Sequence, residues 1–589
     1  MKFLLAAINA KYIHANLAVY SLSAYVRKKQ PKAQIELCEY TINHRAEQIL
    51  QDIYRRKPDV VGFSCYIWNI TYVQELVKDL LKVSPKTEIW LGGPEVSWSA
   101  REALEKEPGL RGILRGEGEE SLSRLVAAYL AAEEHKAPLS HAAFKEIPGI
   151  TFCTPKGEVS ENPPAPLLAM DELPFPYENL DGFENRILYY ESSRGCPFSC
   201  SYCLSSLDKS VRFRSLSLVE RELKIFLDKR VGQVKFVDRT FNCKKEHTLG
   251  IWRYLLAHDN GITNFHFEVS ADLFGEEELS LISAMRPGLI QLEIGVQSTN
   301  PRTLTEIRRK TDLAALKMSV NRIHAFGNTH QHLDLIAGLP CEGMESFLNS
   351  FNEVHSMHPD QLQLGFLKVL KGSYMAKQTE CYGLKHRTLP PYEVLETRWL
   401  SFDELIRLKE MEEMVEVYYN SGQFKQTMRL LLNRFAKASD LYLALSEYYR
   451  NQGLFAVSHS RLSRYEILYR FVCGLLGAEP ARFRDALLYD LYLRENIKSR
   501  PSFASDQTPY KKEIRAFFEA EAACPVWLFG YEGYEARQLA KMAHLEIMED
   551  GSRVLFDYKN RNPLSHNART VRLPKSAKEE KHDRFLCGR

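Results

Sequence analysis

Short apolar runs and segments of helical period alternate along the first 135 residues of the chain. The runs are almost continuously apolar, whereas residues 17–29 and 70–82 carry apolar side chains every three or four positions. Continuous apolar strands joined by helices are typical of a parallel sheet covered on both faces. With right-handed crossovers, this pattern predicts a doubly wound domain that binds ligands beyond the carboxyl ends of its strands. The predicted strands cover residues 2–9, 35–40, 59–66, 88–93 and 112–116.

A second alternating series follows a proline-rich stretch. Prolines crowd residues 138–176, which predicts a linker with a few short strands over 136–185. From residue 186 onward, apolar strands again alternate with helical segments such as 216–229 and 312–327. Repeated strand–helix units of this kind predict a full or partial (β/α) barrel, similar to a TIM barrel, over 186–385. Its predicted strands cover residues 186–196, 234–241, 265–272, 289–298 and 332–340.

The last third of the chain has a different pattern. Residues 392–420 and their neighbours up to about 495 have helical period, and residues 544–558 could form a β-hairpin. The end of the chain, 575–589, is charged and is expected to be loose. We therefore predict an α/β protein with four segments. These are a doubly wound, Rossmann-like (flavodoxin-like) domain at 1–135, a linker at 136–185, a barrel at 186–385 and a mainly helical extension at 386–589.

Composition and charge narrow the class of protein. A chain of 589 residues is long enough for about three domains. Its 45% apolar and 26% charged residues are usual for a soluble protein, and a net charge of +3 gives no case for nucleic acid or a membrane as partner. No apolar run reaches the roughly 18 residues of a membrane helix, and residues 1–8 read as a strand rather than a signal peptide. We therefore expect a cytoplasmic protein, in which the twelve cysteines are reduced thiols or metal ligands.

Three cysteines in SSRGCPFSCSYCLSS (192–206) carry the strongest chemical signal. Cys196, Cys200 and Cys203 have the spacing Cys-x3-Cys-x2-Cys and follow a predicted strand at the start of the barrel series. Three thiolates on one loop can each hold one iron of a cubane cluster and leave the fourth iron open. The alternatives are a structural zinc site or three unrelated thiols. A zinc site needs a fourth ligand nearby, and the next cysteine, Cys243, lies forty residues further on.

The motif and its placement resemble the radical S-adenosylmethionine (SAM) family. The resemblance implies a [4Fe–4S] cluster whose open iron binds SAM, and an electron donor such as flavodoxin or ferredoxin. Tyr202 stands in the family's aromatic position before the third cysteine, where it can pack on the adenine. Strands that read VDRTF, FEVSAD, LEIGVQS and DLIAGLP also resemble the family's SAM-binding strands. The implied SAM-binding residues are Tyr202, Asp238, Glu268, Glu293, Gln297 and Gly338, with Gly295, Asp334 and Pro340 beside them. Each acid taken alone could equally pair with Arg or Lys or cap a helix.

The first domain, taken together with the barrel, resembles the cobalamin-binding radical SAM family. The resemblance rests on GFSCY (62–66), LGGPEVS (91–97) and RGEGEESL (115–122), and it implies cobalamin contacts at Ser64, Gly92, Gly93, Gly116 and Glu117. One departure concerns the family's Asp-x-His-x-x-Gly motif. Residues 9–20 contain His14 but neither the Asp nor the Gly, so His14 is better read as a loop histidine bonded to backbone than as a cobalt ligand. A domain that only shapes the barrel mouth is the remaining alternative. Glu119 and Glu120 are expected to open a helix.

The resemblance implies a radical SAM enzyme, with cobalamin-dependent methylation of an unactivated carbon as the first hypothesis. A cyclase or rearrangement enzyme without methyl transfer is the second hypothesis, and a non-catalytic iron–sulfur or cobalamin sensor is the third. The substrate cannot be read from the sequence, because a barrel lined by SAM-binding residues serves unrelated substrates. The extension resembles an uncharacterised region found on some of these proteins and shows no chemistry of its own.

Overall fold

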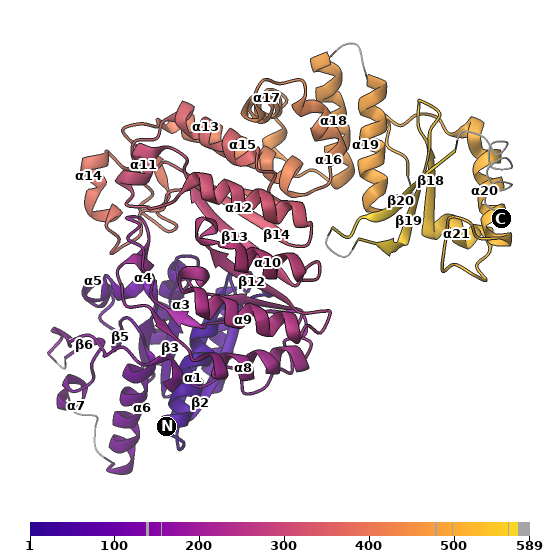
Figure 1. Ribbon diagram of the computed structural model, residues 1–589. Coiled ribbons are helices and arrows are strands. Elements are labelled where there is room, and N and C mark those ends of the chain that lie inside the picture. The colour runs from indigo at the N-terminus through magenta and orange to yellow at the C-terminus, as the bar shows by residue number, and fades with distance from the viewer. Residues whose placement is uncertain (137–140, 155, 477–479, 498, 563–564, 575–589) are drawn as a thin grey trace. The chain divides into compact units, whose positions relative to one another are not determined.

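The computed structural model describes residues 1–136, 141–154, 156–476, 480–497, 499–562 and 565–574 (Figure 1). The chain divides into two compact units. The first comprises residues 1–347 with 365–405, and the second comprises residues 348–364 with 406–589. Among the described residues, no helix combines the length and apolar character needed to span a bilayer.

The first sheet has seven strands in the order β2-β1-β3-β4-β5-β6-β7. Strands β1 to β5 are parallel, whereas β6 and β7 join antiparallel at one edge. The order reverses at β1, between β2 and β3, which is where doubly wound folds bind ligands. The predicted linker thus contributes two strands to this sheet. The strands are β1 (Lys2–Asn9), β2 (Gln34–Thr41), β3 (Val60–Ser64), β4 (Glu88–Gly92), β5 (Gly112–Leu114), β6 (Ile150–Cys153) and β7 (Val159–Glu161).

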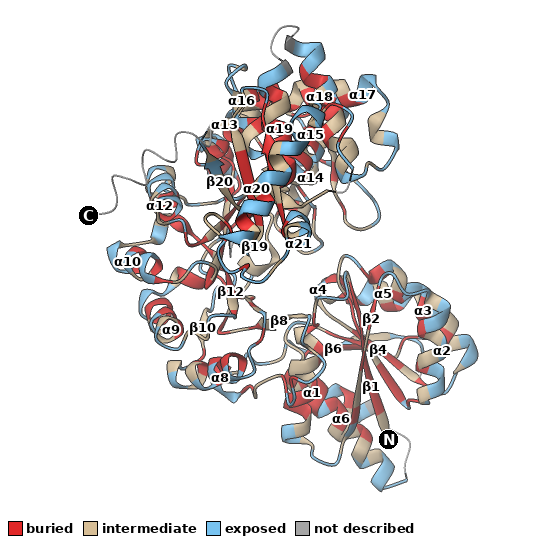
Figure 2. Cartoon of the chain, turned by 90° about the vertical axis from the view of Figure 1, so that its right-hand side faces the viewer, coloured by how far each residue is buried: buried red, intermediate tan, exposed pale blue. Residues whose placement is uncertain are grey.

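Helices cover both faces of this sheet, as the alternating pattern predicts (Figure 2). On one face, Val19 of α1 and Leu122 of α6 pack in a core with Phe3 and Leu5. On the other face, α2 and α3 enclose a second core with Leu4, Ala6 and Ile8. Successive β1 side chains therefore enter opposite cores, which explains why its residues are apolar without interruption. The helices are α1 (Leu17–Lys29), α2 (Ala46–Arg56), α3 (Ile70–Val83), α4 (Pro94–Ser97), α5 (Ala100–Lys106), α6 (Glu119–Glu134) and α7 (His141–Lys145).

The second sheet has the strand order β15-β14-β13-β12-β11-β8. The pairs from β8 to β14 are parallel. Its edge strands β8 and β15 do not pair, so the described chain forms a partial barrel rather than a closed one. The strands are β8 (Ile187–Tyr190), β11 (Gln233–Phe236), β12 (Asn264–Val269), β13 (Ile290–Gln297), β14 (His330–Ala337) and β15 (Gln361–Phe366), and short strands are β9 (Ser193–Arg194), β10 (Arg212–Phe213), β16 (Lys385–His386) and β17 (Val394–Glu396).

Strand β13 shows how this sheet separates its two faces. Ile290, Leu292, Ile294 and Val296 are buried, whereas the residues between them are only half-buried. This period of two places Gln291, Glu293, Gly295 and Gln297 on the other face, where polar side chains remain accessible. The helices between the strands are α8 (Leu216–Asp228), α9 (Lys245–Ala257), α10 (Glu276–Ala284), α11 (Pro301–Glu306), α12 (Leu313–Phe326), α13 (Met344–His355) and α14 (Thr379–Tyr382).

The remaining chain is mainly helical and ends in a small sheet. Helix α15 begins at Phe402, later than the predicted start at residue 392, because residues 394–396 form β17. The predicted hairpin at 544–558 is present as β18 and β19, and β20 extends it to three antiparallel strands. The predicted loose end, 575–589, lies outside the described residues. The elements are α15 (Phe402–Val415), α16 (Lys425–Leu432), α17 (Ala438–Asn451), α18 (Arg461–Leu476), α19 (Pro480–Arg494), α20 (Lys511–Ala523), α21 (Ala536–Met542), β18 (Ala543–Ile547), β19 (Arg553–Arg561) and β20 (Ala568–Leu573).

A buried carboxyl group in the second unit gives a pH-dependent prediction. Asp490 of α19 accepts hydrogen bonds from Gln426 N at 3.0 Å and Thr427 N at 2.9 Å, at the start of α16. Burial raises its pKa to about 7, although these hydrogen bonds oppose the shift. An unfolded Asp titrates near pH 4 (about 3.9). The folded group therefore keeps its proton between about pH 4 and 7 while the unfolded group loses it, so the free energy of unfolding falls as pH rises through that window.

Urea unfolding of the apoprotein from pH 4.5 to 8 tests this expectation. The wild type should lose stability as pH rises towards 7 and then level off. Asp490→Asn should flatten this slope, whereas the exposed Asp440→Asn should keep it. Equal slopes in wild type and Asp490→Asn would contradict the expectation.

Candidate functional site

The three motif cysteines lie on the loop after β8, at the carboxyl end of the second sheet. Cys196 and Cys200 are buried, Cys203 is half-buried, and all three are free thiols. The loop begins directly after β9, which pairs antiparallel with β10. Barrels of this kind gather their chemistry at the carboxyl ends of their strands.

Backbone geometry fixes this loop, which we call the cysteine loop (residues 195–208). Gly195 has a φ of +93°, and a Cβ added there would come within 2.4 Å of Ser210 O. Only glycine therefore fits before the first cysteine. Ser201 N donates to Ile307 O and Ser201 O accepts from Met375 N, each at 2.9 Å. Two distant segments thus hold the middle of the loop.

Asp238 supports the strand end that precedes the cysteine loop. Its carboxylate accepts from Ser192 N at 3.0 Å, from Ser192 Oγ at 2.6 Å and from Ser193 Oγ. Asp238 is 1% exposed, and burial raises its pKa although these hydrogen bonds oppose the shift. The family resemblance implies that Asp238 binds SAM. In the structure both carboxylate oxygens are engaged by the two serines.

Arg309 reaches the cysteine loop from the segment after α11, and the sequence analysis missed it. Its Nη1 lies 3.8 Å from Cys200 Sγ, and its Nη2 donates to Gly295 O at the end of β13. The only sequence feature that points to Arg309 is the basic run 308–310 after the strand that ends in GVQS. Tyr202 lies between Cys200 and Cys203 and is half-buried.

The donor set fits an iron–sulfur cubane better than a single ion. Among the described residues, no group of three or more His, Cys, Asp or Glu side chains is arranged to hold one metal ion. Ligands of one zinc ion converge on a single point, whereas the cysteines of a cubane each bind a different iron and lie further apart. Three free cysteines on one fixed loop, with Arg309 beside one of them, match the arrangement of cubane ligands.

Ionisable side chains from neighbouring strands meet inside the partial barrel. Glu293 Oε2 of β13 lies 3.0 Å from Lys235 Nζ of β11 and 2.9 Å from His266 Nε2 of β12. Burial alone would raise the pKa of Glu293, but the hydrogen bond from His266 and the charge of Lys235 lower it to about 2. Glu268 Oε1 lies further from Lys235 Nζ, at 3.8 Å, and burial together with the charge of Glu293 raises its pKa. Glu268 and Glu293 thus both approach Lys235 inside the partial barrel.

The other predicted SAM residues differ in their surroundings. Gln297 has a φ of +71° next to a bulge in β13, and its buried Oε1 has no hydrogen-bond partner. Asp334 of β14 lies 2.9 Å from His332 Nε2. Gly338 has a φ of +87°, and a Cβ there would approach Val394 Cγ1 to 2.7 Å. Gln297 therefore offers a free polar atom, whereas Gly338 is required by packing.

A cavity of about 1300 Å³ lies at the carboxyl ends of the first sheet's strands and reaches the cysteine loop. Its wall includes the predicted cobalamin residues Ser64, Gly92, Gly93, Gly116 and Glu117. It also includes loop residues Gly195, Leu204, Ser205, Leu207 and Asp208. Sites for drug-sized ligands span roughly 300–1,000 Å³, so this cavity suits a larger ligand. Apolar side chains between the sheet and the helices α1 and α6 extend it into the domain.

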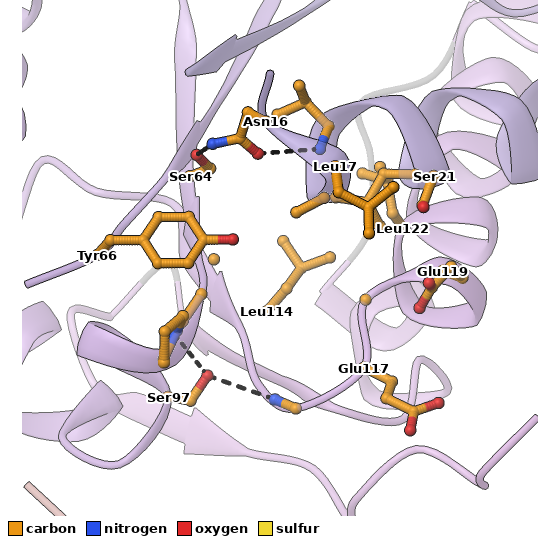
Figure 3. A pocket seen from close by; sticks show the side chains of 18 of the residues that line it. Asn16, Leu17, Ser21, Ser64, Tyr66, Ser97, Leu114, Glu117, Glu119 and Leu122 are labelled. Carbon is orange, nitrogen blue, oxygen red and sulfur yellow. Dashed lines mark hydrogen bonds between the residues drawn. The ribbon is translucent and has the colours of Figure 1, made fainter. Parts of the chain in front are cut away.

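Hydrogen bonds between polar groups hold the wall of this cavity (Figure 3). Asn16 Nδ2 donates to Ser64 Oγ at 3.1 Å. Ser97 Oγ donates to Gly93 O at 2.8 Å and accepts from Gly116 N at 3.4 Å. Gly93 has a φ of +115°, and a Cβ there would clash with Cys65 O at 2.5 Å. These contacts fix the turns after β3, β4 and β5, so the cavity wall is built before a ligand arrives.

His14 also lines the cavity, but its bonding differs from the expectation. Its Nδ1 lies 2.7 Å from the Tyr189 hydroxyl, a side-chain group rather than backbone. Burial lowers the pKa of His14, and the charges of Lys11, Lys235 and Arg186 act in the same direction. His14 is therefore a neutral residue at neutral pH.

Ion pairs join the loop after β5 to the cysteine loop's base. Arg194 lies 3.1 Å from Glu117, 2.6 Å from Glu119 and 2.8 Å from Glu191. Arg212 also pairs with Glu117. We call these five residues the clasp. Glu117, predicted as a cobalamin contact, is thus the shared acid of the clasp, and Glu119 opens α6 as expected.

Family models match three consecutive parts of the chain. A model described as "B12 binding domain" matches residues 4–126, and one described as "Radical SAM superfamily" matches residues 190–354. The chain is a radical SAM protein with a B12-binding domain. The radical SAM domain implies a [4Fe–4S] cluster and SAM, and the B12-binding domain supports cobalamin. A third model, described as "Protein of unknown function (DUF4080)", matches residues 380–565 of this radical SAM protein.

Named relatives of the radical SAM protein include methyltransferases. It is 25% identical over 493 residues to the cobalamin-dependent radical SAM methyltransferase TokK of Streptomyces tokunonensis, covering 77% of this chain and 68% of that protein. It is 27% identical over 316 residues to the uncharacterized methyltransferase PH0819 of Pyrococcus horikoshii, covering 50% of this chain and 64% of that protein.

Two solved structures share the fold of the radical SAM protein. OxsB, with aqua-cobalamin and SAM bound, is 16% identical with a TM-score of 0.56, and the match covers 83% of each chain. TsrM from Kitasatospora setae, with cobalamin and a [4Fe–4S] cluster bound, is 16% identical with a TM-score of 0.53, covering 67% of this chain and 79% of that one. Both likenesses support the predicted fold class, with a Rossmann-like domain and a radical SAM domain. The predicted domain boundaries and site residues stay predictions.

Proposed function

We propose that this protein is a cobalamin-dependent radical SAM methyltransferase that acts on an unactivated carbon. The observation that carries the proposal is the shared cavity: strand ends of the B12-binding domain and residues of the cysteine loop line the same space. When bound, the cluster with SAM supplies one-electron cleavage of SAM, and cobalamin supplies a methyl group. A ligand in this cavity would lie directly beside the cysteine loop, as coupled chemistry requires.

The chain's own residues divide into ligands, pocket residues and supports. Cys196, Cys200 and Cys203 are the proposed cluster ligands. Tyr202, Glu268, Glu293 and Gln297 are the proposed SAM contacts, because they are accessible from the barrel interior or lie in the cysteine loop. Asp238 and Gly338 are proposed as positioning residues. Asp238 accepts hydrogen bonds from Ser192 and Ser193, and Gly338 packs against Val394.

The proposed cobalamin contacts are Ser64, Gly92, Gly93 and Gly116. Gly93 keeps its turn close to Cys65, and Gly116 has open space beside its Cα, which admits a bulky ligand. We propose that Glu117 holds Arg212 and Arg194 rather than the ligand. The Tyr189 contact of His14 gives no support for cobalt ligation.

Anaerobic reconstitution tests the proposed function. Purified protein given iron, sulfide and hydroxocobalamin should bind about four iron atoms and one corrin per chain. With SAM and dithionite it should form 5′-deoxyadenosine, and with substrate also S-adenosylhomocysteine. Deoxyadenosine without S-adenosylhomocysteine would favour a cyclase or rearrangement enzyme. A cluster that binds no SAM would overturn the proposal and favour the non-catalytic sensor.

A further inference from the structure

Arg239 is an exposed cation in the wall of the large cavity that the B12-binding domain shares with the cysteine loop. It lies three residues after β11 ends at Phe236, at the carboxyl end of the second sheet. Within the described ranges, its guanidinium makes no ion pair and no hydrogen bond. A guanidinium has N–H donors that match the oxygens of a carboxylate or phosphate. Arg239 therefore presents unused donors to this cavity.

The other charged side chains of this wall are already paired. Arg115 lies 2.7 Å from Glu161, and Asp208 lies 3.7 Å from Arg212. The remaining four are the clasp residues Arg194, Glu117, Glu119 and Glu191. The clasp has more acids than bases, but in the part of the chain that the structure describes none of its carboxylates lies within ion-pair distance of Arg239. Arg239 is thus the charged group of this wall that remains open to a ligand.

Tyr66 offers a second donor from the B12-binding domain. Its ring extends from the loop after β3, and its hydroxyl points into the same cavity (Figure 3). The ring stacks on Trp68, with centroids 4.4 Å apart and 7° between the planes, which fixes its direction. Among the described residues, no hydrogen bond is found for this hydroxyl. Burial raises the pKa of Tyr66 and the charge of Arg239 lowers it, so the phenol keeps its proton at neutral pH and lies within electrostatic reach of Arg239.

Arg239 also acts on the inside of the partial barrel. Burial and the charge of Glu293 raise the pKa of Glu268 on the neighbouring strand β12, and the charges of Lys235 and Arg239 oppose this shift. Arg239 thus lies where the cavity meets the barrel interior. A substrate that reacts with groups from both cofactors has to lie at this meeting point, because reacting atoms must approach to about 3–3.5 Å.

We propose that Arg239 and Tyr66 form an anion subsite that holds a carboxylate or phosphate group of the substrate. The guanidinium supplies charge-assisted hydrogen bonds from the barrel, and the phenol donates from the B12-binding domain. The inference rests on the proposed function and adds a substrate class to it, namely anionic molecules rather than neutral ones. SAM also carries a carboxylate and cobalamin a phosphate, so the test separates these two anions from that of the substrate.

Phenylglyoxal labelling of the reconstituted protein tests the subsite. The reagent adds to accessible guanidinium groups, and peptide mass spectrometry measures the labelling rate of each arginine. With hydroxocobalamin and SAM bound, Arg239 should still react, and inorganic phosphate should then suppress its labelling. Tyr66→Phe should raise the phosphate concentration at half-suppression about threefold, because it removes one neutral hydrogen bond.

Arg221 of α8 is the internal control, because it is exposed, lies outside the cavity wall and has no ion pair among the described residues. Its labelling rate should not change with phosphate. Arg239→Gln and the matched variant Arg221→Gln should both keep the wild-type corrin content and the wild-type Kd for SAM.

Labelling of Arg239 that phosphate does not slow would overturn the subsite while the proposed function stands. Full suppression by SAM alone, with weaker SAM binding in Arg239→Gln, would instead make Arg239 a ligand of the SAM carboxylate. Suppression by hydroxocobalamin alone, with corrin lost from Arg239→Gln, would make it a cobalamin contact, and either result would overturn the inference. A wild-type protein that binds neither corrin nor SAM would overturn the proposed function and this inference together.

Discussion

Cys200→Ala is expected to leave a folded protein that holds no four-iron cluster and does not cleave SAM. Cys200 is buried on the fixed cysteine loop, and its removal leaves two thiolates for a cluster that needs three. Iron after reconstitution should fall from about four atoms per chain to near zero. The 5′-deoxyadenosine formed with dithionite should fall to background.

Cys473→Ala is the control for this prediction, because Cys473 is an exposed thiol in the second unit. It should keep the full iron content and the full rate of SAM cleavage. Circular dichroism should show the same helical content in both variants. A cluster that still cleaves SAM in Cys200→Ala would refute the assignment of the ligands.

Asp238→Ala is expected to destabilise the first unit strongly and to lower cluster content. Its loss leaves the buried Ser192 amide and the Ser193 hydroxyl without their acceptor, whereas the Ser192 hydroxyl keeps His247 Nε2 at 3.0 Å. Each buried donor left unpaired costs about 1–3 kcal/mol, so a loss of roughly 2 kcal/mol or more in the free energy of unfolding is expected from the two donors. The strand end before Cys196 should loosen as a result.

Urea unfolding of the apoprotein and iron content after reconstitution measure these two effects. Asp228→Asn, which removes an exposed carboxylate paired with Lys224, should change stability by less than about 0.5 kcal/mol. Adding Ser193→Ala to Asp238→Ala should recover part of the lost stability, because it removes one orphaned hydroxyl. Equal stabilities of Asp238→Ala and Asp228→Asn would show that the three hydrogen bonds do not hold the strand end.

The features that the sequence predicts well are local in the chain. The cysteine spacing and the period-two pattern of β13 both fall within a few residues, so they can be read directly. The cavity residues Ser64, Gly92 and Gly116 follow from strand ends that must meet at one edge of a parallel sheet. Family resemblance supplied what the pattern alone does not give, namely SAM and cobalamin.

The features that were missed depend on pairs of residues far apart in the chain. Asp238 and Ser192 are 46 positions apart, and Arg194 and Glu117 are 77 apart. An acid that follows a strand looks the same in sequence whether it binds a ligand or a neighbouring loop, so the sequence alone does not separate these roles for Asp238 and Glu117. Arg309 was missed for the same reason, since its partners are a thiol and a carbonyl on other elements.

The clasp ties the B12-binding domain to the barrel through ion pairs. Glu119 is 5% exposed and Arg194 14% exposed, and the two side chains pair between the two parts of the first unit. Severing the B12-binding domain from the barrel would separate Glu117 and Glu119 from Arg194 and Arg212, although Arg194 would keep Glu191. The B12-binding domain and the barrel should therefore express poorly as separate proteins and regain solubility when they are produced together.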